Sequence, residues 1–289
     1  ARALVHDNVT LETGCEVTRL FSDKSGRISA VETKKGKSRR RLKPKLVVLC
    51  AGAVNSAALL LKSADQHNPR GLANSSDQVG RNFMNHNCSA IMALHPLRKN
   101  HAIYQKTLQF NDYYLRGGID DMPLGNVQLL GKISGNILAS QTSLPHFAAR
   151  WVARHSVDWY VMSEDLPNPD SRVTVTDDQI SLDWKRTNQT THQALVAKAK
   201  SVLRRAGYPI VISRAFDRRT PSHQCGTARF GPDPATSVLD IYCRSHDHKN
   251  LFVMDASFLP TSAAVNPALT IAAQALRVGA HIMEKDFAA

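Results

Sequence analysis

The chain has 289 residues, of which 43% are hydrophobic and 21% are charged, a composition that can bury a sizeable core. Its longest apolar runs are too short to span a bilayer, which argues against a transmembrane segment in this chain. The five scattered cysteines form no C-x-x-C pair, so we expect neither a disulfide scaffold nor a metal site. This pattern favours a reducing compartment such as the cytoplasm, and a targeting signal ahead of Ala1 would not be visible here.

The first part of the chain predicts strands followed by a strand–turn–helix unit. Alternating or clustered apolar residues predict strands at 8–13, 17–21 and 27–33. The continuous apolar run at 46–50 is typical of a strand that is buried on both faces. Ala51, Gly52 and Ala53 then lead into a helix over 55–63. Such small residues let a ligand approach the backbone closely, as in half of a dinucleotide-binding βαβ unit.

A basic run accounts for much of the formal net charge of +13. It covers 34–45, where eight of twelve residues are Lys or Arg, and it lies between two strand-like segments. That position is typical of a solvated hairpin tip. A nucleic-acid-binding module built around the run is an alternative. However, no aromatic residue interleaves the basic ones, as base stacking would require, so we expect no nucleic-acid partner.

The middle of the chain predicts an antiparallel sheet and a helix. Strand-like segments separated by polar turns lie at 127–130, 157–162, 172–176 and 180–184. Asp177, Asp178 and Gln179 join the last two segments in a pattern typical of a hairpin. The apolar spacing over 191–205 predicts a helix that ends at Gly207.

The end of the chain returns to α/β character. The apolar run at 251–254 predicts a buried strand. Asn266 and Pro267 begin a helix that runs to about 282, because Asn is a favoured N-cap and Pro a favoured first helical residue. This order predicts a cofactor domain in two segments, 1–86 and 222–289, interrupted by a substrate-binding domain with an antiparallel sheet at 87–221.

Three short pieces in the last seventy residues carry candidate chemistry. The first holds His223 in a Gly-bearing turn, the second is a strand that ends at Asp255, and the third is the helix entered through Asn266. A helix N-terminus beside a strand end can hold an anionic group. A histidine, with an unperturbed pKa of about 6.5, can take a proton at neutral pH, and an asparagine can hold an alkoxide.

These pieces, in this order and spacing, resemble the C-terminal signature of the glucose-methanol-choline (GMC) flavin oxidoreductases. His223 opens a His-x-x-Gly-Thr-x-Arg pattern, and Asn266 heads an Asn-Pro-x-Leu-Thr motif. The resemblance implies α/β architecture with an α+β insertion: a Rossmann-like three-layer FAD-binding domain and an antiparallel-sheet substrate domain. It implies oxidation of an alcohol or sugar hydroxyl by hydride transfer to FAD, with His223 as base and Asn266 as its partner. Electrons would then pass to oxygen, a quinone or a protein acceptor.

The resemblance also implies where FAD would be contacted. Val17 lies in a segment like the one whose valine backbone touches adenine, and Ala51 opens a helix entry like the family's. The segment 71–86 resembles the family's link into the substrate domain. Pro267 has no N–H, so amide donors to the pyrimidine edge would begin at Ala268. The implied contacts are Val17, Ala51, Gly52, Asn55, Asp255, Ala256, Pro267, Ala268, Leu269 and Thr270.

Departures from the family pattern are also present. No Gly-x-Gly-x-x-Gly occurs in the chain, although in the family this fingerprint cradles the FAD pyrophosphate. Phe230 stands where the family has Met. We therefore expect an incomplete FAD-binding domain. The alternatives are a truncated or inactive protein without stable FAD binding, a subunit completed by another chain, and a non-redox lyase of the same fold.

Overall fold

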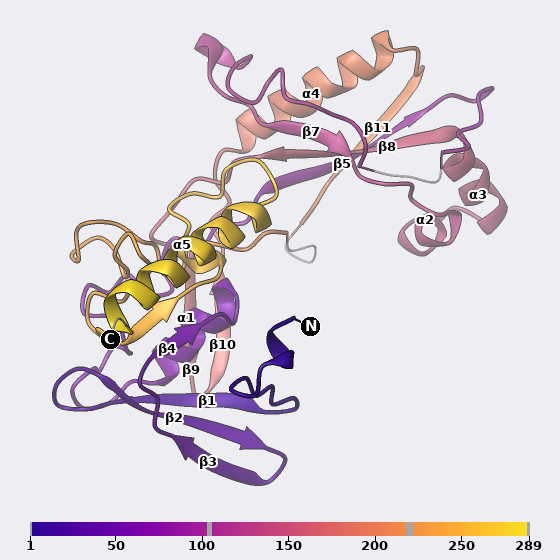
Figure 1. Ribbon diagram of the computed structural model, residues 1–289. Coiled ribbons are helices and arrows are strands. Elements are labelled where there is room, and N and C mark those ends of the chain that lie inside the picture. The colour runs from indigo at the N-terminus through magenta and orange to yellow at the C-terminus, as the bar shows by residue number, and fades with distance from the viewer. Residues whose placement is uncertain (1, 103–105, 218–221, 288–289) are drawn as a thin grey trace.

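The computed structural model describes residues 2–102, 106–217 and 222–287. Figure 1 shows two regions of mixed α/β structure. The antiparallel region at the top contains a five-stranded sheet and helices α2, α3 and α4, and the parallel-strand region below it contains α1, α5 and three small sheets. The chain passes between the two regions several times, so segments far apart in sequence meet at their junction (Figure 1).

The parallel-strand region opens with a short 3-10 turn, η1 (Arg2–Val5), and an antiparallel sheet of β1 (Glu16–Ser22), β2 (Ile28–Lys35) and β3 (Ser38–Leu42). All five residues of β3 are exposed. The basic run therefore forms the exposed second strand of the β2–β3 hairpin as well as its tip. The predicted solvent exposure is confirmed, but the run is not just the tip between the two predicted strands, because it supplies β3, and β4 pairs with β12 instead of β2.

The predicted strand at 8–13 is wrong. These residues form no regular structure and are exposed. Alternation of apolar and polar residues indicates a preference only, and among the described residues this segment has no partner strand to hydrogen-bond with. A lone extended segment is not stable in water.

The centre of this region is a pair of parallel strands, β4 (Val47–Leu49) and β12 (Leu251–Val253), which meet across two hundred residues of chain. Helix α1 (Ala53–Lys62) leaves the end of β4, close to its predicted position. Leu60 and Phe252 are fully buried in the core between these elements, where each contributes about 1.5–3 kcal/mol of burial free energy. Val48 is 45% exposed, so β4 is not buried on both faces as predicted, because this sheet has just two described strands.

The antiparallel region is built on a sheet with strand order β11-β5-β8-β7-β6. Helix α4 (Gln189–Arg205) covers it, and Leu195, Ala199 and Leu203 pack against Val127 and Val161 of the sheet. The strands are β5 (Asn87–Leu94), β6 (Gln109–Phe110), β7 (Asn126–Leu129), β8 (Ser156–Ser163) and β11 (Ile210–Ala215). The smaller helical elements are η2 (Ile119–Asp121), α2 (Gly135–Gln141) and α3 (His146–His155).

The hairpin of β9 (Arg172–Thr176) and β10 (Gln179–Asp183) has the predicted turn. Asp177 and Asp178 both have positive φ, at 48° and 64°, as a two-residue hairpin turn requires. The hairpin does not join the five-stranded sheet, which corrects the prediction of one antiparallel sheet. Instead β9 packs beside α1, and Val173 N–H donates to the Gly80 carbonyl at 2.8 Å.

The last helix, α5 (Ala268–Asp286), follows the short 3-10 turn η3 (Ala256–Phe258) and a loop. It begins beside the antiparallel region and runs down along the parallel-strand region (Figure 1). The helix starts one residue later than predicted, with Pro267 as its cap residue and no side-chain capping bond, so Asn266 is not its N-cap. None of the helices among the described residues is long and apolar enough to cross a membrane.

Candidate active site

His223 lies at the junction of the two regions, in a turn that is held on both sides. Its backbone is in the left-handed region, with φ of 58°. Two residues later, Cys225 and Met84 exchange backbone hydrogen bonds of 3.0 Å. At Gly226, φ is 89°, and an added Cβ would lie 2.4 Å from the Asn82 carbonyl oxygen, so only glycine fits. The Gly-bearing turn thus fixes where the imidazole can lie.

The same segment is tied to the strand ends below it. Gly226 N–H donates to the Ala256 carbonyl at 3.2 Å, and Ala228 N–H donates to the Ser257 carbonyl at 3.0 Å. The buried Thr227 hydroxyl donates to the Ala53 carbonyl at 2.6 Å. These bonds join the histidine turn to the start of α1 and to the residues that follow β12, three segments that are distant in sequence.

The structure brings together the two residues predicted to do chemistry. Asn266 Nδ2 lies 3.3 Å from His223 Nε2, and Asn266 Oδ1 accepts a bond of 3.1 Å from Gln128 Nε2 on β7. His223 is half-buried, whereas Asn266 is exposed. We call His223, Asn266, Gln128 and the neighbouring His86 the histidine corner. It carries a ring nitrogen that can accept a proton and an amide that can donate to an oxygen.

The electrostatics of this corner favour a neutral imidazole. Burial, and after it the positive charge of Lys106, lower the pKa of His223 below its ordinary value of 6.5. A histidine that is neutral at physiological pH can act as a general base. Lys106 had no signal in the sequence, because it reaches the site from a loop 117 positions before His223.

His86 is a second histidine at this site, and it was not among the predicted site residues. It is 2% exposed, and its ring packs edge-on against His223 with 4.9 Å between centroids. Neither of its ring nitrogens has a hydrogen-bond partner within the described ranges. Burial first, and then the facing His223, lower the pKa of His86 to about 4, so it stays neutral. Its position at the end of the family-like link segment, 71–86, was the available signal.

A second group, which we call the strand-end corner, surrounds Asp255. The carboxylate accepts from Gly52 N–H at 2.9 Å and from Ser257 N–H at 2.8 Å. The hydroxyls of Ser56 and Ser257 also donate to it. The side chain of Asp255 therefore binds the end of β12 to the start of α1. The predicted FAD contact could come only from the backbone here, since the carboxylate is fully engaged by protein donors.

The remaining residues predicted to contact FAD lie mostly on open surface. Along the entry to α1 and the first turn of α5 the exposed residues are Ala51, Asn55, Ala268, Leu269 and Thr270. Gly52 and Pro267 are half-buried, as is Ala256. Val17 lies on β1, in the three-stranded sheet at the far end of the molecule from the antiparallel region (Figure 1).

This arrangement fits one edge of an anionic cofactor. Both α1 and α5 begin without a side-chain cap, so their first-turn amides are available at the carboxyl ends of β4 and β12. An added Cβ at Gly52 would meet no atom within 4 Å, which leaves open space in front of the strand ends. The part of the chain that the structure describes has no cluster of His, Cys, Asp and Glu that could hold a metal ion.

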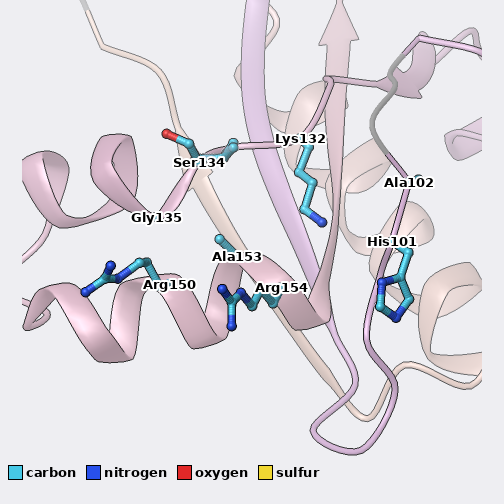
Figure 2. A pocket seen from close by; sticks show the side chains of 9 residues that line it. His101, Ala102, Lys132, Ser134, Gly135, Arg150, Ala153 and Arg154 are labelled. Atoms are coloured by element: carbon cyan, nitrogen blue, oxygen red, sulfur yellow. The ribbon is translucent and has the colours of Figure 1, made fainter.

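One hollow lies beside this site, and another lies away from it. The first has a volume of about 660 Å³. It is lined by Asn111, Asp112, Tyr114, Leu115, Arg116 and Val265, the last of which precedes Asn266 in the sequence. The other, of about 380 Å³, is shown in Figure 2. Lys132, Arg150 and Arg154 surround it on the α2–α3 side of the antiparallel region, and it includes no residue of either corner. Of these two hollows, the one beside Asn266 adjoins the histidine corner.

Comparisons with known proteins agree with this geometry. Two family profiles, both described as GMC oxidoreductase, match residues 1–88 and 166–275. The chain is 30% identical to 6'''-hydroxyparomomycin C oxidase of Streptomyces lividus over 96% of its length, and 28% identical to the fructose dehydrogenase large subunit of Gluconobacter japonicus over 92%. It covers 52% of each of these relatives, so it spans about half their length.

A solved structure has a fold similar to that of this chain. The crystal structure of pyridoxine 4-oxidase from Mesorbium loti matches with a TM-score of 0.65 and 20% sequence identity, over 96% of this chain and 59% of that one. At this identity the likeness concerns the fold alone. The two profiles together with relatives that match along nearly the whole chain show that this protein belongs to the GMC oxidoreductase family.

Proposed function

We propose that this protein acts in an FAD-dependent oxidation of an alcohol or sugar hydroxyl. The observation that carries the proposal is the contact of 3.3 Å between His223 Nε2 and Asn266 Nδ2 at the junction of the two regions. Relatives named as a hydroxyparomomycin oxidase and a fructose dehydrogenase support a hydroxyl-bearing substrate. In the domain organisation that we propose, 1–86 and 222–289 form the FAD side and 87–221 the substrate side, except for the β9–β10 hairpin, which packs beside α1.

In this proposal His223 takes the hydroxyl proton at Nε2. Its lowered pKa keeps the imidazole neutral at neutral pH, so that one ring nitrogen can accept a proton. Asn266 Nδ2 donates a hydrogen bond to the substrate oxygen and stabilises the charge that grows there. Gln128 holds the Asn266 amide in the orientation that points its N–H groups toward the histidine. Substrate would enter from the hollow beside Val265.

FAD, when bound, would supply the hydride acceptor. The residues suited to hold it are the first-turn amides at Ala268, Leu269 and Thr270 and the backbone around Gly52 and Ala256. Oxygen, a quinone or a protein would be the final electron acceptor.

The test is anaerobic addition of alcohols and sugars to the protein incubated with FAD, followed by flavin absorbance. We expect bleaching of the oxidised flavin band with at least one class of hydroxyl substrate. If the protein binds FAD and no primary alcohol, secondary alcohol or sugar reduces it, the proposed activity is wrong.

A second candidate is a protein that does not bind FAD stably by itself, or a subunit completed by another chain. The exposure of α5 favours it: Val278 is the one buried residue of this helix, whereas Leu269, Leu276 and Met283 are 82%, 78% and 64% exposed. Such an apolar face is unusual for a free surface. Stoichiometric FAD in the purified protein, without any added chain, would contradict this candidate.

A further inference from the structure

His223 is one end of a line of hydrogen bonds that enters the five-stranded sheet. Ser222 Oγ lies 3.4 Å from His223 Nδ1 and 2.6 Å from the hydroxyl of Tyr160 on β8. The Tyr160 hydroxyl in turn donates to Cys88 Sγ on β5 at 2.9 Å. Tyr160 and Cys88 are buried, so water has little access to their polar groups.

Hydroxyls and thiols can donate or accept, but once Tyr160 donates to Cys88 the remaining contacts have one consistent direction. Tyr160 has a single O–H, and it is used on Cys88, so its oxygen must accept from Ser222. The Ser222 hydrogen is then committed to Tyr160, and its oxygen is left to accept from His223 Nδ1–H.

The opposite end of the imidazole favours the same direction as long as Asn266 keeps its bond to Gln128. Asn266 uses its carbonyl oxygen to accept from Gln128, so it presents an N–H to His223 Nε2. An Nε2–H tautomer would set two donors against each other at 3.3 Å. Nε2 must therefore accept, and the ring proton must lie on Nδ1.

We infer that Tyr160 and Ser222 are positioning residues that hold His223 in the Nδ1–H tautomer, so that the unprotonated nitrogen, Nε2, faces Asn266 and is the proton acceptor. This inference rests on the proposed function only for its catalytic consequence. Free histidine side chains favour neither a fixed ring orientation nor this tautomer. The line of hydrogen bonds therefore determines which ring nitrogen acts as the base. Neighbouring contacts assist it: Ser222 N–H donates to Asn85 Oδ1 at 2.8 Å, and Tyr160 packs on Phe216.

The test is nitrogen NMR of the histidine rings in the protein, which distinguishes the two neutral tautomers without any flavin. The chain has 12 histidines, so the signal of His223 is assigned as the one that disappears in His223→Asn. We expect one Nδ1–H form for His223 in the unmodified protein. In Ser222→Ala we expect a mixture of tautomers, and Ser222→Thr, which keeps a hydroxyl, should retain the single form.

Tyr160→Phe should give a mixture with a larger Nδ1–H share than Ser222→Ala, because Ser222 remains but can turn away. Tyr208→Phe, on the same region but outside the line, is the matched control and should change nothing. In flavin reduction by substrate, Ser222→Ala should lower the rate about fivefold to tenfold, the equivalent of one lost hydrogen bond, with FAD binding unchanged.

An Nε2–H signal for His223 in the unmodified protein would overturn the inference, as would a single Nδ1–H form that survives in Ser222→Ala. If the variants do not fold, the spectrum of the unmodified protein alone still decides the tautomer. If the tautomers behave as expected and no hydroxyl substrate reduces the flavin, the proposed function fails while the positioning role stands.

Discussion

The strand-end corner and the histidine corner lie side by side, and they use their polar groups in opposite ways. The Asp255 carboxylate is buried and accepts from four protein donors: the bonds from Gly52 and Ser56 join β12 to α1, and the two from Ser257 cap the turn η3. The histidine corner holds an exposed amide at Asn266 and a buried His86 without hydrogen-bond partners in the described chain. The first corner is therefore a support, whereas the second holds polar side chains where a ligand can reach them.

The largest effect should come from removing the support. Asp255→Ala should lower the free energy of unfolding by about 3 kcal/mol or more, because each buried donor left unpaired costs about 1–3 kcal/mol. Urea unfolding at neutral pH measures this change. Asp183→Ala is the matched control: it removes an exposed ion pair with Lys185 and should change stability by less than about 1 kcal/mol. Equal losses of stability in the two variants would contradict the supporting role of Asp255.

The next effect concerns the turn that joins the corners. Gly226→Ala should cost about 2–4 kcal/mol, since a side chain there meets both positive φ and the Asn82 carbonyl. Gly279→Ala, in the interior of α5 with nothing within 4 Å of an added Cβ, should instead stabilise the protein by about 0.5–1 kcal/mol. Thermal unfolding of the two variants compares them directly. A tolerated Gly226→Ala would mean that the turn is not fixed.

Acid should lower the free energy of unfolding, because the folded protein holds buried histidines in their neutral form. The pKa of His86 and that of His192 are each lowered to about 4, mainly by burial, against about 6.5 in the unfolded chain. Between these values the unfolded state binds more protons, so stability is complete above about 6.5 and falls as the pH drops toward 4, by up to about 3 kcal/mol for each histidine. His86→Gln should remove about half of this pH dependence in urea unfolding, and an unchanged slope would contradict the burial account.

The smallest effect concerns the charge beside the base. Lys106→Gln should raise the pKa of His223, because it removes a positive charge that disfavours the imidazolium. The acid limb of kcat/KM should then move to higher pH. Because Lys106 is exposed, high salt should shift the unmodified protein in the same direction and leave the variant nearly unaffected. Identical pH profiles would exclude Lys106 from the site.

Elements with local signals were predictable from the sequence. The β9–β10 hairpin follows from Asp177 and Asp178, and the end of α4 follows from Gly207, which takes a φ of 94°. Strands β5 and β11 were missed. Strand β5 is buried on nearly its whole length, so its sequence does not alternate. Residue patterns also could not show that β9 and β10 leave the sheet for α1, since that depends on contacts between distant segments.

The site residues also fall into two groups, those that a sequence motif predicted and those that it did not. The pairing of His223 with Asn266 followed from motif spacing. Gln128 and Lys106 come from segments that carry no motif, and His86 ends the family-like link segment without having been predicted as a site residue. For Asp255 the sequence indicated the right place but not the use of its carboxylate. The roles of His223 and Asn266 in catalysis and the cofactor contacts stay predictions.

The central claim is that the histidine corner carries the chemistry through His223. The most direct measurement is the rate of flavin reduction after anaerobic mixing of hydroxyl substrate with FAD-loaded protein, compared between the unmodified protein and His223→Ala. The account predicts a rate lower by about 10²–10⁴-fold in the variant, the usual contribution of a general base, with FAD still bound. Reduction at the unmodified rate in His223→Ala would contradict it.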